Sequence, residues 1–420
     1  MSVGPVPGQP ELAERAARIA ARPAARPDRT ALRARLAVSG LFWFCGMTWG
    51  LWCAALPALS GRLRLGEGRV GTALLLTSVG ALAVMPVAGR MCDRWTSRRV
   101  ARAAGLGAMA AAAGPALASS YGVFLVTAAV LGACLGILDV AMNAHGLEVE
   151  QRSPRPVMSS FHGLWSLGGV TGGVVVTIAQ HAGTSGPTAM AGGVLAAGLL
   201  FLSPSGMLLP GRAARHLPRT ATHRPHKAVV SRLAPTMFRH SVILLALLAM
   251  AAFLSEGAAE DWSALHTSRV LGTGPGTASM AYTTFAAAMT AMRLAGDGLR
   301  ARINPRRLAR LAGGTATGGY SLVAAAALLG GGSVPCAFVG WALVGLGLAP
   351  LVPVILGAAA SRGATMSSVS VVTTFGSAGL LCGPAAIGAL AGASSLRVAI
   401  LLPGAITLAV AVAGPTALRT

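Results

Sequence analysis

Three carboxylates stand close together in FLSEGAAEDWSAL (residues 253–265), directly after an almost wholly apolar run. Glu256, Glu260 and Asp261 make up a quarter of the 12 acidic residues in this chain of 420. Glu256 and Glu260 are one turn apart and share a face of a helix, whereas Asp261 is rotated by about 100°. Because burial disfavours the charged form of a carboxylate, we expect Glu256, together with Glu260, to take up a proton or bind a substrate. The alternative is a solvated helix end.

Other ionisable and amide side chains stand inside apolar runs. Asp139 and Asn143 are four residues apart and lie on one face of a helix, where they predict either a proton or substrate site or a structural bond between helices. Arg293 stands one turn before Asp297 and pairs either with that acid or with an acid on another helix.

Aromatic and histidine side chains complete the candidate set. His162 and Trp165 are three residues apart and predict a ligand wall, unless His162 instead bonds a loop. Trp49 is expected to offer a stacking surface for a substrate, with lipid-facing packing as the alternative. The six cysteines are scattered and show neither a zinc spacing nor a disulfide framework, so we expect no metal and no cofactor.

The elements that must position these side chains are apolar helices. The chain is 54% hydrophobic and only 11% charged, whereas a soluble protein is about a quarter charged. Runs long enough to cross a ~30 Å hydrocarbon core recur along its whole length. These runs are 37–60, 69–89, 100–118, 121–145, 158–181, 187–209, 240–260, 276–299, 309–330, 335–357, 366–391 and 396–415. The sequence therefore predicts an all-α polytopic membrane protein with twelve transmembrane helices, whose first partner is the lipid bilayer.

Arginines gather in alternate connections, as the positive-inside rule requires of cytoplasmic loops. The rule places both termini in the cytoplasm and accounts for the net charge of +22 without nucleic-acid binding. The predicted parts are a disordered basic cytoplasmic tail (1–36), a six-helix half (37–209), a basic cytoplasmic linker (210–239) and a second six-helix half (240–420). One outer loop, with Arg62, Arg64 and Arg69, is the exception to the rule. Asp261 and Trp262 are expected at the outer membrane interface.

Two related loops follow the second and the eighth predicted helix. GRMCDRWTSRR (89–99) and RLAGDGLRARINPRR (293–307) each place an aspartate at a helix end and paired arginines before the next helix. The first resembles the signature G-x-x-x-D-R-x-x-x-R-R of the major facilitator superfamily, and LDVAMNAHGLEVE (138–150) and RPVMSSFHGLWSLGG (155–169) resemble its fucose-permease-like branch. The resemblance implies a gate with two arrangements, formed by Gly89, Arg90, Asp93, Arg94, Arg98, Arg99 and Asp297. The plainer alternative is a positively charged anchor with one neutralising acid.

The resemblance also implies a function. It predicts a secondary active transporter, not an enzyme, that moves a small molecule across the cytoplasmic (inner) membrane by alternating access. We expect transport to be driven by the proton gradient and the protein to be a monomer. No G-x-x-x-x-G-K-[ST] loop is present, which excludes ATP-driven transport by this chain. The fourth helix lacks the arginine, and the fifth the proline, of related drug exporters, which favours uptake or exchange over drug or antibiotic efflux by proton antiport. A non-transporting membrane sensor is the remaining alternative.

Overall fold

The computed structural model describes residues 29–153, 157–209, 236–329, 333–361 and 366–418. Most of the predicted tail (1–36) and linker (210–239), and the side chain of Asp297, lie outside this described part. Within it the chain consists of helices joined by short connections and contains no strand. The predicted all-α class is therefore confirmed.

The first half consists of six long helices followed by a short 3-10 helix. They are α2 (Arg29–Arg62), α3 (Glu67–Trp95), α4 (Ser97–Leu117), α5 (Tyr121–Glu150), α6 (Met158–His181), α7 (Gly186–Leu202) and η1 (Ser203–Met207). Each of the first six predicted spans overlaps one of these helices. The first helix is longer than predicted, because α2 begins at Arg29, eight residues before the apolar run, and its first turns are polar.

The second half repeats this order with two interruptions. Its helices are α8 (Thr236–Val270), α9 (Pro275–Arg302), α10 (Pro305–Leu329), α11 (Val334–Leu348), α12 (Leu351–Ser361), α13 (Met366–Ala393), α14 (Leu396–Ala399) and α15 (Leu401–Ala417). The tenth predicted span is broken between α11 and α12, where Pro350 removes a backbone donor. The twelfth is divided into α14 and α15.

Length and composition suit most of these helices to a membrane. In the described part, nine helical segments are long and apolar enough to cross a bilayer. The apolar stretch of α7, Gly186–Leu200, is shorter, and α9 and α10 are long enough but less apolar. The polar groups of α9 and α10 must find most of their hydrogen-bond partners within the protein, because lipid offers none.

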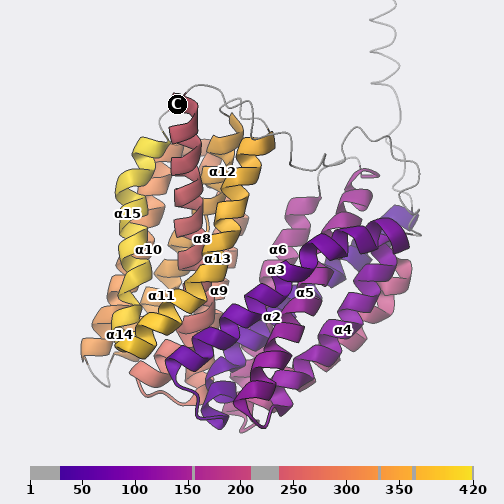
Figure 1. The fold of residues 1–420 in the computed structure, drawn as a ribbon, viewed down its shortest axis with the longest axis horizontal. Coiled ribbons are helices and arrows are strands. Elements are labelled where there is room, and N and C mark those ends of the chain that lie inside the picture. Colours follow the sequence, from indigo (N-terminus) through magenta and orange to yellow (C-terminus); the bar gives the residue numbers. More distant parts are fainter. Residues whose placement is uncertain (1–28, 154–156, 210–235, 330–332, 362–365, 419–420) are drawn as a thin grey trace, which may run out of the picture.

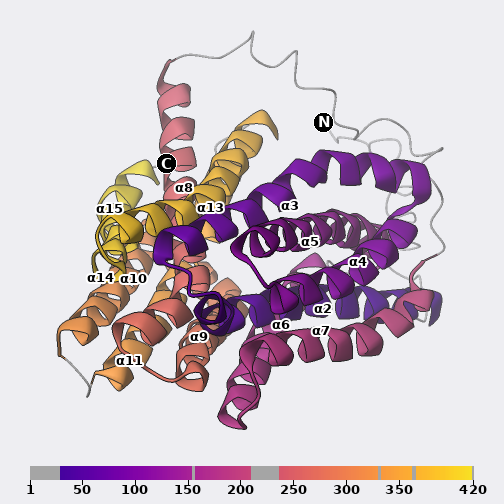
Figure 2. The ribbon, with the colours of Figure 1, turned by 60° about the horizontal axis from the view of Figure 1, so that its bottom comes forward.

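The two halves form two bundles that converge at one end and diverge at the other, where the chain terminates (Figure 1). We call the convergent end the Glu67 end and the divergent end, which carries the α3–α4 junction, the Asp93 end. Across the halves α2 packs on α8 and α9, α6 on α9, and α3 on α13 (Figures 1 and 2). The arrangement therefore closes the interface between the halves at the Glu67 end.

Glycine permits the closest of these approaches. A Cβ added to Gly71 of α3 would lie 2.6 Å from the Cα of Gly388 of α13, so the two backbones meet directly. Small residues serve this purpose in membrane helix packing. The glycines of α6 allow a similar approach to α2, since a Cβ on Gly172 would lie 2.6 Å from the backbone nitrogen of Leu51.

One of the three arginines that depart from the predicted charge rule, Arg62, has a structural partner. Arg62 donates to the backbone oxygens of Ala116, Pro115 and Ala118 at the end of α4. The last carbonyls of a helix lack intrahelical donors, and a cation there also meets the negative end of the helix dipole. Arg62 is therefore held by α4 as a C-terminal cap.

Candidate functional site

An ion pair between two helices of the second half reaches across to the first half. Arg293 Nη2 of α9 lies 2.6 Å from Glu256 Oε1 of α8, and Arg293 Nη1 donates to Ser166 Oγ of α6 at 3.1 Å. The side chain of Glu256 is 8% exposed and that of Arg293 32%. Of the two partners expected for Arg293, the structure selects an acid on another helix. Asp297 lies outside the described side chains.

Glu260 meets the first half through a different group. Its Oε2 accepts a hydrogen bond of 3.2 Å from the indole nitrogen of Trp49 on α2. Glu260 stands one turn after Glu256 and is buried. The two acids predicted to share a face of one helix therefore both lie at the interface between the halves. Trp49 uses its ring N–H there.

The prediction that Asp261 and Trp262 mark the outer membrane interface is wrong. Their exposed fractions are 3% and 0%, and Cys53 Sγ of α2 donates to Asp261 Oδ1 at 3.8 Å. The helix does not end near residue 260 but continues to Val270. The stretch WSALHTSRV reads as a loop because it is polar, yet it remains helical because it faces protein.

A cluster at the Glu67 end joins α8 to the connection between α2 and α3. Arg269 Nη1 lies 3.1 Å from Glu67 Oε1, and Arg269 Nη2 donates to Ser60 Oγ at 3.0 Å and to Leu65 O at 2.8 Å. We call these four residues the Arg269 latch. Sequence reasoning missed it, although two signals were available. Arg269 lies on the side with few basic residues, and Glu67 is an acid in the first half on that same side.

A second set of bonds closes the same end beside the latch. Ser279 Oγ of α9 lies 2.8 Å from the backbone oxygen of Ala54 on α2 and 3.0 Å from Gln180 Oε1 on α6. The hydroxyls of Thr177 and Thr283 are 3.3 Å apart. These polar contacts, like the latch, must break before the halves can separate at the Glu67 end.

Asp139 and Asn143 form a local pair on α5. Asn143 Nδ2 donates to Asp139 Oδ1 at 3.2 Å and to the backbone oxygen of Asp139 at 2.9 Å. Both side chains are half-buried. The predicted shared face is therefore present, and the amide orients the carboxylate. In the described part no contact joins this pair to the Glu256 site.

His162 and Trp165 lie on α6 close to Ser166. The His162 ring is exposed and packs edge-on against Phe42 of α2, with ring centroids 5.2 Å apart. Trp165 is half-buried. The hydroxyl that contacts Arg293 belongs to the next residue, Ser166, which sequence reasoning passed over because a serine in a glycine-rich helix carries no signal of its own.

In this structure the described side chains of the predicted gate form no ion pair with one another. Asp93 is exposed, and within the described residues it makes no ion pair. Arg94 lies over the Trp95 ring, 6.0 Å from its centroid, and Arg98 Nη2 donates to Gly206 O at 2.9 Å. A Cβ added to Gly89 would meet nothing within 4 Å.

Arg90 and Arg99, the other two arginines of the gate, are exposed. Thr96, at the α3–α4 junction, has φ 86° and accepts the backbone N–H of Arg99. The junction thus fixes the backbone turn, while the charged side chains around Asp93 stay accessible. The gate hypothesis predicts a second arrangement, in which Asp93 is paired.

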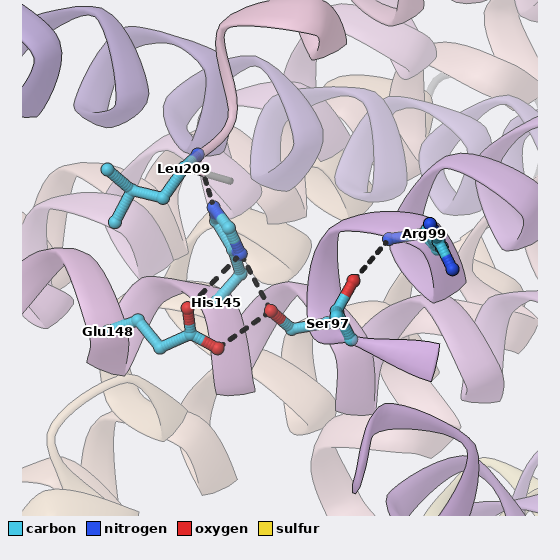
Figure 3. A network of polar contacts seen from close by, with 6 residues as sticks. Ser97, Arg99, His145, Glu148 and Leu209 are labelled. Carbon is cyan, nitrogen blue, oxygen red and sulfur yellow. Dashed lines mark hydrogen bonds and ion pairs between the residues drawn. The ribbon is translucent and has the colours of Figure 1, made fainter. Parts of the chain in front are cut away.

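Also at the Asp93 end, a buried histidine joins the last described residue of the first half to α4 and α5 (Figure 3). The backbone N–H of Leu209 donates to His145 Nε2 at 3.1 Å, so this nitrogen carries no proton. His145 Nδ1 then donates to Ser97 Oγ at 2.8 Å, and Ser97 Oγ donates to Glu148 Oε1 at 2.8 Å. The network anchors the segment just before residue 210 to α4 and α5.

No group of three or more His, Cys, Asp or Glu side chains suited to a metal ion occurs among the described residues. What the arrangement offers chemically is proton exchange and ion pairing. Three carboxylates, Glu256, Glu260 and Asp261, are buried within α8, and Arg293 is paired with Glu256. Asp139 is half-buried within α5.

The chain matches known families along most of its length. The model described as Major Facilitator Superfamily matches residues 38–363. An uncharacterised transporter, y4wD, of Sinorhizobium fredii is 32% identical over 392 residues, covering 90% of this chain and 96% of its own. An uncharacterised MFS-type transporter of Yersinia pestis is also 32% identical, with 85% and 89% covered. The membrane protein MosC of Rhizobium meliloti is 27% identical, with 90% and 88% covered.

Solved structures share the architecture. The nucleoside transporter NupG aligns with a TM-score of 0.67 and 12% identity, covering 93% of this chain and 99% of that one. A bacterial homolog of the human lysosomal transporter Spinster, in an inward-facing and unoccupied conformation, aligns with a TM-score of 0.67 and 15% identity, covering 93% and 97%. At these identities the likeness shows the fold alone, which is that of a polytopic helical transporter.

Proposed function

Because the chain belongs to the Major Facilitator Superfamily, we propose that it is a proton-coupled transporter that carries a small molecule across the cytoplasmic membrane by alternating access. Membership of a transporter family makes it a membrane carrier and not an enzyme. The proposal adds the coupling ion, the direction and the site. The observation that carries it is the pair of buried acids, Glu256 and Glu260, each bound to a group that contacts or belongs to the first half.

Proton uptake at this pair would loosen the interface between the halves. Two carboxylates one turn apart resist being ionised together, and Arg293 pairs with Glu256. Protonation of Glu256 removes the charge that holds Arg293, whose second guanidinium nitrogen contacts Ser166 of the first half. Protonation of Glu260 weakens its bond from Trp49. Proton binding is thereby coupled to opening at the Glu67 end.

Alternating access requires two arrangements of the same contacts. In this structure the Arg269 latch and the Ser279 bonds hold the Glu67 end closed, while Asp93 is unpaired among the described residues. The opposite state would break the first set and engage the Asp93 gate. By the arginine rule the Asp93 end, with both termini, faces the cytoplasm. This orientation makes the state cytoplasm-facing.

The proposed direction is uptake or exchange of a metabolite. The fourth helix, α5, contains no arginine, and the fifth, α6, no proline, which distinguishes this chain from the drug exporters of the superfamily. Drug efflux by proton antiport is the second candidate. The proposal needs no cofactor beyond the proton gradient and a single copy of the chain. NupG carries nucleosides, but a shared fold at 12% identity does not extend that substrate to this chain.

The proposal is tested by substitution of Glu256. Comparing metabolites inside and outside cells with and without the protein identifies a transported compound, which is then followed in proteoliposomes. In Glu256→Gln, accumulation driven by a pH gradient should be abolished, because the group that takes up the proton is gone. Exchange of labelled for unlabelled substrate should persist, since exchange needs no net proton movement. Wild-type pH dependence in this variant would return the acids to a structural role.

A further inference from the structure

A cavity of about 560 Å³ opens at the Asp93 end between the start of α10 and the end of α15. The two helices pack on each other at the edge of the second half that is remote from the first half (Figure 1). The cavity is lined by Asn304, Arg306, Arg307, Arg310, Leu311, Pro415 and Thr416. It is therefore separate from the Glu256 site, which lies at the interface between the halves.

The wall of this cavity that α10 provides is positively charged. Three of its lining residues are arginines, and none of the described residues that line it is acidic. Arg306 Nε donates to Leu418 O at 3.2 Å, and Asn304 Oδ1 accepts the Arg306 backbone N–H at 2.9 Å, which fixes one wall. Arg307 and Arg310 are exposed, and no ion pair engages either of them among the described side chains. Two permanent positive charges thus face the cavity without a counter-charge from the described side chains.

The rim adds an apolar side. Leu311 lines the cavity and is 50% exposed, and Pro415 lies across from it on α15. The cavity therefore offers guanidinium groups at its arginine wall and hydrocarbon beside them. A ligand that satisfies both would carry an anionic head and an apolar body.

We propose that this cavity binds the phosphate headgroup of an anionic phospholipid. The guanidinium fork matches the oxygens of a phosphate in geometry as well as charge. Basic pockets between helices at the membrane boundary suit such headgroups. Inorganic phosphate has the same anionic chemistry, but it leaves the Leu311 rim unused, so the observations favour the lipid.

The first half supplies a matched control. SRRVAR (97–102) at the start of α4 repeats PRRLAR (305–310) at the start of α10. In each copy the first arginine donates to a backbone oxygen near the end of the sixth helix of its half, Gly206 O for Arg98 and Leu418 O for Arg306. Arg102 is therefore the counterpart of Arg310, exposed but outside the cavity.

Binding can be measured on the full chain purified in a neutral detergent, with bound lipids counted by native mass spectrometry. The protein is titrated separately with phosphatidylglycerol, phosphatidylcholine and inorganic phosphate. Arg310→Gln should weaken the tightest phosphatidylglycerol site about fivefold, and Arg307→Gln with Arg310→Gln about 25-fold, as expected for ~1 kcal/mol from each arginine. Arg102→Gln should leave that site unchanged, and phosphatidylcholine should not occupy it.

Three results would overturn the proposal. The first is unchanged phosphatidylglycerol affinity in the double variant. The second is an equal loss in Arg102→Gln, which would make the effect one of total charge. The third is inorganic phosphate binding as tightly as the lipid with the same arginine dependence, which would identify the free anion as the ligand. None of these measurements depends on transport, so they stand apart from the test of the Glu256 site.

Discussion

Arg293 is a permanent charge among apolar helices, and its two partners come from two different helices. The salt bridge to Glu256 is 2.6 Å long, and Ser166 takes a second guanidinium nitrogen. Breaking a buried ion pair by removing one partner costs about 3–5 kcal/mol, because the other charge is left uncompensated. Arg293 is 32% exposed, so solvent screens part of this and the lower end of that range applies.

The pair therefore predicts a recovery in the double variant. Glu256→Gln and Arg293→Gln should each lower the free energy of unfolding by about 3 kcal/mol, whereas both together should cost less than the more harmful single change. Thermal unfolding of the purified protein at fixed detergent measures this. If the two losses simply add, the charges do not stabilise each other, and Arg293 must pair with another acid.

Helices, at the next scale, decide which side chains meet. The α3–α4 junction presents Asp93 at an exposed position, where the described residues offer it no ion pair. The other end of α3 is packed on α13 through Gly71 and Gly388. Gly89 lies 18 residues after Gly71, which is five full turns at about 3.6 residues per turn, so both face the same side of α3. One face of α3 thus carries Gly71, which contacts α13 in this structure, and Gly89, whose surroundings are open.

The gate predicts a functional loss without a structural one. Asp93→Asn removes no bond that the described residues make, so the free energy of unfolding should change by less than about 0.5 kcal/mol. Transport should nevertheless fall severely, because the charge is needed in the other state. Membrane abundance and proteoliposome uptake measure the two effects. Asp93→Glu, which keeps the charge, should restore part of the activity, and near-normal transport in Asp93→Asn would contradict the gate.

Both halves together determine which end is open. The Arg269 latch is partly exposed, so its ion pair to Glu67 is worth at most about 1 kcal/mol. Its bonds to Ser60 and Leu65 add a comparable amount. A loss of about 1–2 kcal/mol on one side of a two-state equilibrium changes its populations by roughly 5–30-fold.

Loss of the latch should therefore open the Glu67 end more often. Cys53 of α2 is buried against Asp261 of α8, so its accessibility reports this opening. In a variant with Cys53 as the sole cysteine, Arg269→Gln should raise its rate of alkylation by an impermeant maleimide at least about fivefold. Arg64→Gln removes an exposed arginine from the α2–α3 connection next to Leu65 of the latch and should have no effect. An unchanged rate in Arg269→Gln would show that other contacts hold this end closed.

Much of this architecture is readable in the sequence because apolar length and charge placement are local properties. The helices and the shared faces of Glu256 with Glu260 and Asp139 with Asn143 follow from spacing alone. Partners do not. Trp49 is 211 residues from Glu260, and Arg293 is 127 from Ser166, so their meeting depends on the rotation of whole helices in the bundle. For that reason the sequence does not predict the Arg269 latch or the His145 network. The polar residues after Glu260 indicate a helix end, and this places Asp261 wrongly at the membrane interface.

The two equivalent bonds from Arg98 and Arg306 have a consequence for how the chain is made. Each joins the start of a third helix to the close of a sixth within the same half. In the first half, His145 also fastens Leu209, the last described residue before the linker. The contacts that finish the first bundle thus lie entirely upstream of residue 210. Domains fold in order of synthesis, so the first bundle can be completed at the ribosome while the arginines of the second are still untranslated.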